Sequence, residues 1–392
     1  MKIHNRKTCD CLLIAAVALF GNLTASADTV YVAYVNTNTI EKFDLASGAD
    51  LGVFASTGLS EPYGLALDSA GDLYAANAAN NTIEKFTPGG LGSVFANAGL
   101  DIPVGLAADS VGNIYAGNTN SDQFAPGYVQ KFTPGGVGSF FASTGDDPSG
   151  LAFDSAGNLY VANANDNTIY KITPGGVVSL FASTASYPSG LAVDSAGNLY
   201  VTIYFSNTIE KFSSAGTDLG AFASTGLSGP AGLAFDSAGN LYVANTTNNT
   251  IEKFTTGGVG SLFANTGGVP TFIAIQHTPI AAQIQPPINS DGSSVFKASR
   301  GVVPVKFTLA IGGVATCNLP PATISVTRTA GGTIGPIDES IYVSSADSGP
   351  NFRVSDCQYV YNVAASGLGV GTYQVDITIG GGVVGSGVFG LK

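Results

Sequence analysis

The chain has 392 residues, of which 45% are hydrophobic and only 11% are charged, and its formal net charge is −12. Residues 28–278 hold most of the acidic excess, with 20 acidic residues, six lysines and no arginine. An acidic surface repels phosphate groups, so nucleic acid and an anionic membrane surface are disfavoured as partners. Basic proteins, cations and neutral polymers are compatible with this charge.

Residues 1–27 have the features of a secretory signal peptide. Three basic residues between Lys2 and Lys7 precede an apolar run at residues 12–20, and Ala25-Ser26-Ala27 forms a small-residue cleavage site. The apolar run is too short to span a bilayer comfortably, and no later stretch approaches that length. We therefore expect a protein that is secreted, periplasmic or at the cell surface after cleavage near Ala27, with a retained signal anchor as the alternative.

A repeat with a period near 40 residues follows. Its clearest copy is G-L-A-F-D-S-A-G-N-L-Y-V-A-N at residues 232–245, and similar stretches begin at Gly64, Gly105, Gly150 and Gly190. In each copy four short apolar runs are separated by a glycine turn, a polar loop and a Gly-Gly reversal, which predicts four antiparallel strands. Four strands at this period are typical of a β-propeller blade.

The two ends of the repeat region carry complementary halves of one copy. Residues 29–43 match the second and third strands without a first strand, and residues 270–276 match the first strand without a second. Pairing of these halves would leave no unpaired sheet edge between them. We therefore predict an all-β chain in which residues 28–277 form a six-bladed propeller closed by strands from both termini.

One lysine and one tyrosine recur in every copy. The lysines occupy the same position of the third strand: Lys42, Lys85, Lys131, Lys171, Lys211 and Lys253. They could form a ring of anion-binding groups, but we favour a packing role, because a lysine stem can cover apolar surface while its charge pairs with a repeated acid. The second-strand tyrosines are explained by core packing.

The order P-x-G-L-A-x-D-S-x-G-N-L-Y-V-A-N and then N-T-I-x-K-F resembles NHL repeats over about residues 29–276. More loosely, it resembles the SMP-30/gluconolactonase and virginiamycin B lyase propellers. The resemblance implies a propeller, and NHL propellers mostly act as scaffolds and binding modules.

The two enzyme families imply site residues that can be checked here. SMP-30-like lactonases bind a divalent metal through carboxylates or amides that precede the glycine of the first strand. The corresponding residues here are Tyr63, Val104, Ser149, Ser189, Ala231 and Thr271. None of them suits a hard cation, so we expect neither a catalytic metal nor a cofactor, and we leave structural calcium open. A lyase needs a catalytic histidine, and His277 stands alone beyond the last repeat strand.

The composition changes after the repeats. Residues 278–294 contain three prolines and are expected to form a linker. Seven strand candidates in residues 295–392 predict an Ig-like sandwich. The segment V-P-V-K-F at residues 303–307 resembles the PxKF domains of exported bacterial proteins.

Two cysteines, Cys317 and Cys357, follow the expected signal peptide. An exported domain with two cysteines favours a disulfide, since a zinc site would need more ligands than the chain offers. We therefore expect a Cys317–Cys357 disulfide.

Departures from the repeat gather on one face of the predicted propeller, where second strands lead to third strands and one copy leads to the next. The candidate ligand-binding residues on this face are Tyr34, Tyr63, Asp122, Phe124, Tyr187, Tyr204 and Phe205. Residues that packing requires recur in every copy of the repeat. Aromatic residues that stand on a loop face and do not recur are therefore candidates for ligand contact. The alternative is that the loop sequences vary without any function.

Aromatic rings beside acids and amides suit neutral sugars or peptides. We therefore predict an exported, monomeric, non-catalytic protein that presents this face to a carbohydrate or protein ligand. The alternative is a lactonase-like or lyase-like carbohydrate-active enzyme with a degenerate or unrecognised site.

Overall fold

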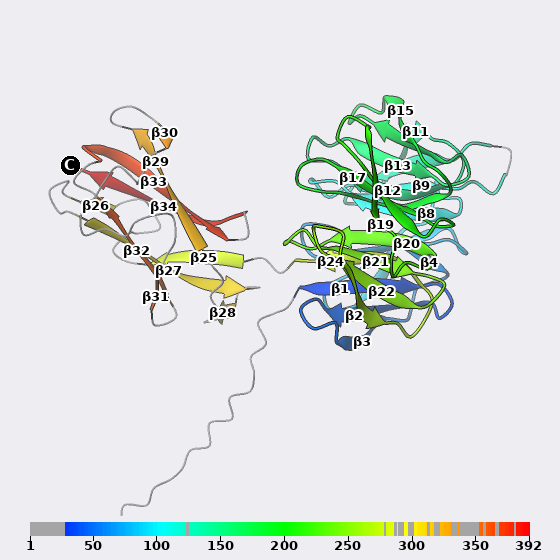
Figure 1. Ribbon diagram of the computed structural model, residues 1–392, viewed down its shortest axis with the longest axis horizontal. Coiled ribbons are helices and arrows are strands. Elements are labelled where there is room, and N and C mark those ends of the chain that lie inside the picture. The colour runs from blue at the N-terminus through cyan, green and yellow to red at the C-terminus, as the bar shows by residue number, and fades with distance from the viewer. Residues whose placement is uncertain are drawn as a thin grey trace, which may run out of the picture.

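The computed structural model describes residues 28–122, 125–277, 280–285, 288, 294–296, 302–311, 314–316, 322–330, 335–336, 353–355, 358–364, 368–379 and 382–392. Within these residues every regular element is a β-strand (Figure 1), and no helix could span a membrane. The expected signal peptide, Phe124, Cys317 and Cys357 lie outside the described residues.

The first 24 strands form six antiparallel four-stranded sheets, in agreement with the strand pattern of the repeat. The first three of these sheets contain β24 (Pro270–Gln276), β1 (Thr29–Tyr34), β2 (Thr39–Asp44), β3 (Asp50–Ala55); β4 (Pro62–Leu67), β5 (Leu73–Asn77), β6 (Thr82–Phe86), β7 (Gly92–Ala96); and β8 (Pro103–Ala108), β9 (Ile114–Asn118), β10 (Tyr128–Phe132), β11 (Gly138–Ser143). The other three contain β12 (Pro148–Phe153), β13 (Leu159–Asn163), β14 (Thr168–Ile172), β15 (Val178–Ser183); β16 (Pro188–Val193), β17 (Leu199–Ile203), β18 (Thr208–Phe212), β19 (Asp218–Ala223); and β20 (Pro230–Phe235), β21 (Leu241–Asn245), β22 (Thr250–Phe254), β23 (Gly260–Asn265).

The seam between the two ends of the repeat region is a strand pair. β24 pairs antiparallel with β1, with Thr29 opposite Gln276 and Val32 opposite Ile273. The pairing expected from the two half-copies is therefore present. The Tyr31 hydroxyl also donates a 2.9 Å hydrogen bond to Oε1 of Gln276 across the seam.

The first strands of the six sheets contact one another in a closed cycle. β4 contacts β8, then β12, β16, β20 and β24 follow in order, and β24 contacts β4. A repeated glycine permits this approach in five of the six first strands, and β24 has Phe272 at that position. A Cβ at Gly150 would overlap the carbonyl oxygen of Ser189 in the neighbouring strand. Glycine is required there because two backbones come within contact distance.

In five of the six sheets the recurring lysine lies over the second-strand tyrosine ring, and in four of these it also pairs with an aspartate. Nζ of Lys171 lies 5.2 Å from the centre of the Tyr160 ring and 3.6 Å from the carboxylate of Asp154. The Tyr160 hydroxyl donates to the same carboxylate at 3.3 Å, and the ring packs edge-on against Phe181. Equivalent contacts recur at Lys85, Lys211 and Lys253, so the packing interpretation of the lysines is confirmed.

The later strands form two five-stranded sheets around one core. One sheet contains β25 (Ile280–Gln285), β27 (Val302–Ile311), β28 (Val314–Thr316), β31 (Arg353–Ser355) and β32 (Gln358–Ala364), and the other contains β26 (Ser294–Phe296), β29 (Ala322–Ala330), β30 (Gly335–Pro336), β33 (Gly371–Ile379) and β34 (Gly382–Leu391). Phe307 and Tyr359 stack in their shared core with ring centres 4.4 Å apart.

The expectation of a linker over residues 278–294 is wrong for its first part. Residues 280–285 are strand β25, which pairs antiparallel with β27. The three prolines of this segment lie at positions 279, 286 and 287, so they flank the strand and do not interrupt it.

Candidate functional site

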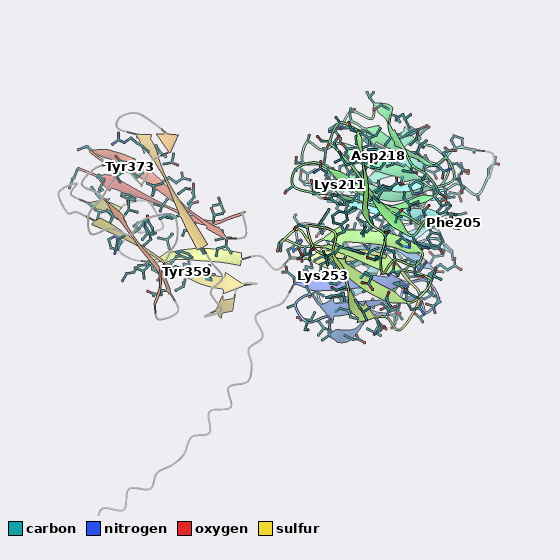
Figure 2. All side chains as sticks on the ribbon, in the orientation of Figure 1. Phe205, Lys211, Asp218, Lys253, Tyr359 and Tyr373 are labelled. Carbon is teal, nitrogen blue, oxygen red and sulfur yellow. The ribbon has the colours of Figure 1, made fainter. Side chains whose placement is uncertain are left out.

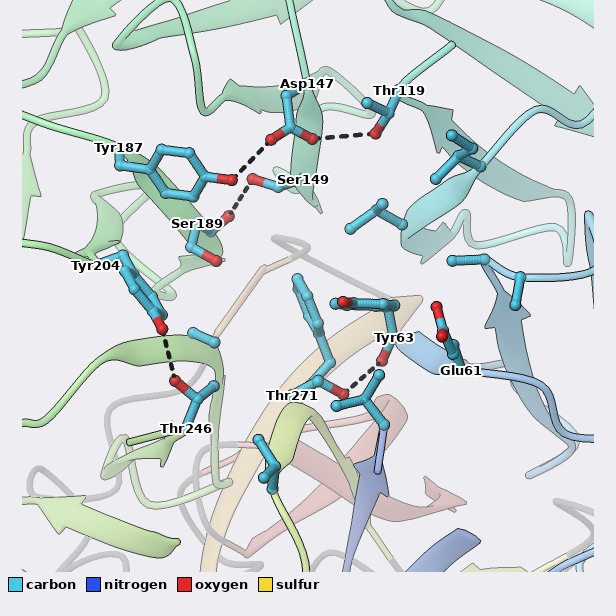
Figure 3. A pocket seen from close by; sticks show the side chains of 18 of the residues that line it. Glu61, Tyr63, Thr119, Asp147, Ser149, Tyr187, Ser189, Tyr204, Thr246 and Thr271 are labelled. Carbon is cyan, nitrogen blue, oxygen red and sulfur yellow. Dashed lines mark hydrogen bonds between the residues drawn. The ribbon is translucent and has the colours of Figure 1, made fainter. Parts of the chain in front are cut away.

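A cavity of about 920 Å³ is lined by residues from all six repeat sheets, on the face that carries the loops between second and third strands (Figure 3). One set of lining residues stands directly before the first-strand prolines: Glu61, Ile102, Asp147, Tyr187 and Val269. A second and more buried set follows those prolines: Tyr63, Val104, Ser149, Ser189, Ala231 and Thr271. A third set follows the second strands: Val35, Ala78, Thr119, Tyr204 and Thr246.

The residues before the prolines adopt an unusual backbone conformation. Four non-glycine residues of this set are left-handed: Glu61 (φ 48°), Ile102 (φ 51°), Asp147 (φ 57°) and Tyr187 (φ 35°). A residue before proline is normally extended, and a left-handed conformation at a non-glycine residue costs about 1–3 kcal/mol. Strain of this kind collects at functional sites, because only surrounding structure can maintain it.

Hydrogen bonds on both sides hold Tyr187 in this conformation. Its N–H donates to Oδ1 of Asn167 at 2.6 Å, and its carbonyl accepts from the N–H of Tyr204 at 3.1 Å. Asn38 bonds the N–H of Glu61 in the same way, also at 2.6 Å. The backbone is therefore fixed where the Glu61 and Tyr187 side chains enter the cavity.

Three aromatic rings form what we call the aromatic platform: Tyr187, Tyr204 and Phe205. Their ring centres are 5.1–6.0 Å apart and each pair meets edge to face. The Phe205 side chain is 67% exposed, although it packs against both tyrosines. The platform therefore presents a rigid apolar surface at the cavity.

The cavity side of Tyr187 is acidic. The Tyr187 hydroxyl donates to Oδ2 of Asp147 at 2.9 Å, and the Thr119 hydroxyl donates to Oδ1 at 3.0 Å. Burial raises the pKa of Tyr63, and the charges of Glu61 and Asp147 raise it further. Tyr63 therefore faces the cavity as a neutral hydroxyl at physiological pH, within electrostatic range of both carboxylates.

No basic side chain balances these acids among the described residues that line the cavity. Five of the six recurring lysines lie over second-strand tyrosine rings. Figure 2 shows Phe205 on one side of the repeat sheets and Lys211 and Lys253 toward the other. The acid–base pairs therefore lie away from the cavity, which carries only negative charge.

The model of the virginiamycin B lyase family matches residues 53–266, more than half of the chain. The chain belongs to the virginiamycin B lyase family. A search of curated proteins finds no match.

Solved structures resemble this family member in fold. A chain of a nidogen/laminin complex is 19% identical, with 64% of this chain and 98% of that chain covered and a TM-score of 0.56. A protein of unknown function from Bacteroides caccae is 13% identical, with 64% and 99% covered and a TM-score of 0.51. A catalytically inactive virginiamycin B lyase from Staphylococcus aureus with quinupristin is 17% identical, with 75% and 95% covered and a TM-score of 0.49. At these identities the likeness concerns the β-propeller fold alone.

His277, the histidine beyond the last repeat strand, lies away from the cavity. Nδ1 of His277 is 3.2 Å from Oδ2 of Asp28, and this hydrogen bond raises the pKa of His277. His277 instead borders a depression formed by the glycine turn at residues 68–71. Among the described residues, no group of three or more histidine, cysteine, aspartate or glutamate side chains could hold a metal ion.

Two hydroxyl groups of the buried set, those of Ser149 and Thr271, donate to backbone carbonyls. Oγ of Ser149 donates to the carbonyl of Pro188 at 3.2 Å. Oγ1 of Thr271 donates to the carbonyl of Ala33 at 3.1 Å. Both bonds join first strands or seam strands, so these hydroxyls bind backbone carbonyls and not a general base.

Four of the seven candidate ligand residues come together in the cavity: Tyr63, Tyr187, Tyr204 and Phe205. Asp122 is exposed and does not line the cavity, and Phe124 lies outside the described residues. The assignment of Tyr34 to the ligand face is wrong, because it is completely buried in a core cluster with Tyr242. The last residue of the second strand is completely buried in all six sheets, and the next residue is partly exposed in four of them, as at Tyr204.

The sequence interpretation missed the acidic residues of the cavity. Glu61, Asp101, Asp147 and the neighbouring Thr119 all line it. The sequence does contain a signal for Glu61 and Asp147, which each precede a first-strand proline. The residue at that position is Glu, Ile, Asp, Tyr, Gly or Val in the six copies, so it varies while the proline is constant.

Proposed function

We propose that the protein is an exported, non-catalytic member of its family that binds a carbohydrate in the cavity. The aromatic platform beside Asp147 is the observation that carries this proposal. Apolar faces of sugar rings pack on aromatic side chains, while sugar hydroxyls donate to carboxylates and exchange hydrogen bonds with Tyr and Thr hydroxyls. A cavity of about 920 Å³ is large enough for a short oligosaccharide.

The architecture that we propose for this function has two parts. The six four-stranded sheets are the blades of a closed propeller over residues 28–277. The two five-stranded sheets are an Ig-like sandwich that begins with β25 and is crosslinked by a Cys317–Cys357 disulfide. The sandwich spaces or docks the propeller after export as a monomer.

The experiment is a glycan array followed by calorimetry on the full-chain protein. We expect neutral or basic oligosaccharides to bind and uronic-acid chains to be rejected, because the cavity is acidic. Phe205→Ala should weaken binding up to about tenfold without lowering the melting temperature appreciably, since a favourable contact with an aromatic ring is worth about 0.5–1.5 kcal/mol beyond the area that it buries.

Phe140→Ala is the matched control. Phe140 is also an exposed phenylalanine, at 64%, but it lies on β11 and does not line the cavity. Equal affinities of wild type and Phe205→Ala for every glycan bound would contradict the proposal.

Family membership favours lyase activity in the same cavity as the second candidate function. Quinupristin is the probe, because a structure of a family lyase contains it. Chromatography and mass spectrometry of quinupristin incubated with the protein test this candidate. A product that forms from quinupristin with wild type and not with Asp147→Asn would favour the lyase over the binding protein.

A further inference from the structure

The charged side chains that line the cavity are Glu61, Asp101 and Asp147, and all are acids. Asp101 accepts hydrogen bonds from both the N–H and the hydroxyl of Ser121, at 2.9 and 2.8 Å. Its partners, like those of Asp147, are neutral donors. Negative potential therefore accumulates in a concave, partly apolar space, where field lines are focused and a cationic ligand is attracted.

Asp147 is the best placed of the three carboxylates to receive a cation. Its side chain is partly buried, and the Tyr187 and Thr119 hydroxyls orient its two oxygens. No ion-pair partner of Asp147 occurs among the residues that the structure describes. Each oxygen retains a lone pair, and a charged donor there would form a bond about twice as strong as a neutral one.

An apolar surface lies next to this carboxylate. Tyr187 joins the two, because its hydroxyl bonds Asp147 while its ring centre is 5.1 Å from that of Phe205. The carboxylate of Asp147 and the ring of Phe205 are thus separated by about the length of one tyrosine side chain, so one ligand can contact both. A sugar ring with an amine directly on a ring carbon has this combination of groups.

We infer that the ligand is an oligosaccharide with free amino groups, whose protonated amine binds the carboxylate of Asp147 while a sugar ring packs on Phe205. This inference rests on the proposed carbohydrate binding and specifies the class of sugar. Acetylation of the amine removes the charge and should weaken binding. A carboxylated sugar is repelled by all three acids.

Three trimers with the same β-1,4 linkage test the inference by calorimetry: the glucosamine trimer, its fully N-acetylated form and the glucose trimer. We expect the glucosamine trimer to bind about tenfold tighter than the other two, because a charge-assisted bond replaces a neutral one. Its affinity should fall as the pH rises through the pKa of the ligand amine.

Two isosteric variants separate a specific site from general attraction. Asp147→Asn should abolish the preference for the amine while the fold persists, because asparagine tolerates a left-handed backbone better than most residues. Asp146→Asn is the control: it makes the same charge change in the same loop, and Asp146 does not line the cavity.

The outcomes are distinct. Equal binding of the glucose and glucosamine trimers would overturn the amine assignment and leave carbohydrate binding intact. Amine binding that is equally reduced in both variants would show only attraction of a polycation to an acidic protein, and would also overturn it. Binding of no trimer and of no glycan on the array would defeat the proposed function itself.

Discussion

Asp147 and Tyr187 occupy the same position of adjacent repeats, 40 residues apart, and are joined by a 2.9 Å hydrogen bond from the tyrosine hydroxyl to the carboxylate. Both stand before a proline in a left-handed conformation. The bond therefore crosses from one sheet to the next at the cavity. It links the aromatic platform to the acid that we propose as the counter-ion of the ligand.

The tyrosines around this bond should make the protein sensitive to alkali. Burial raises the pKa of Tyr187 above its ordinary value of 10.0, as do the charge of Asp147 and its hydrogen bond, and burial also raises the pKa of Tyr63. A pKa that is higher in the folded state gives stability that is complete below about pH 10 and is lost as the pH rises through the folded pKa.

Urea unfolding between about pH 8 and pH 11, together with the tyrosinate absorbance, measures this effect. Stability should fall over that range, and Tyr187→Phe should reduce the fall because it removes one titrating group. A flat unfolding midpoint with early appearance of tyrosinate in the folded protein would contradict this account.

Gly150→Ala should destabilise the protein, because its Cβ would overlap the carbonyl of Ser189 at the closely packed first strands. Overpacking of this kind costs about 1–3 kcal/mol. Gly89→Ala is the matched control, since its Cβ would meet nothing nearer than 3.9 Å, at Oγ1 of Thr87. Denaturant titration of both variants gives the comparison, and equal stabilities would argue against close contact of the first strands.

The seam should be essential to the repeat sheets. A chain that ends at Val269 lacks β24 and exposes the edge of β1, whereas a chain that ends at His277 retains the pair. We expect the shorter chain to melt at a much lower temperature or to aggregate. The same melting temperature for both chains would mean that β1 does not need its partner.

Asp154 should support stability in acid only down to its own lowered pKa. Burial opposes ionisation of Asp154, but hydrogen bonds from Asn158 and the charge of Lys171 outweigh it and lower the pKa. A lowered folded pKa gives stability that is present above the unfolded pKa and is lost as the pH falls through the folded pKa.

The test is Asp154→Ala, which removes the acceptor of the turn amides of Ala156 and Asn158. We expect a loss of about 2–3 kcal/mol near neutral pH, measured by urea unfolding, and a smaller loss in acid. The stability of Asp154→Asn should lie between that of wild type and that of Asp154→Ala, because asparagine retains one acceptor oxygen. A loss that does not depend on pH would show that the charge of Asp154 contributes little.

Much of the fold follows from the sequence because its determinants are local and repeat. The turn D-S-A-G-N places an acceptor and a glycine where one tight turn needs both, and residues 29–43 and 270–276 match halves of one unit. Packing positions such as Tyr160 and Lys171 recur because five of the six sheets present them with the same environment.

Only the tertiary structure decided the composition of the cavity. Tyr34 and Tyr204 are neighbouring positions of the repeat, yet the first is completely buried and the second lines the cavity. Local preference places the residue before a proline in an extended conformation, whereas Asp147 and Tyr187 are left-handed because neighbouring loops hold them. Side chains about 40 residues apart, such as Asp147 and Tyr187, meet at the cavity only because the first strands of adjacent sheets pack closely together. No local sequence pattern predicts that contact.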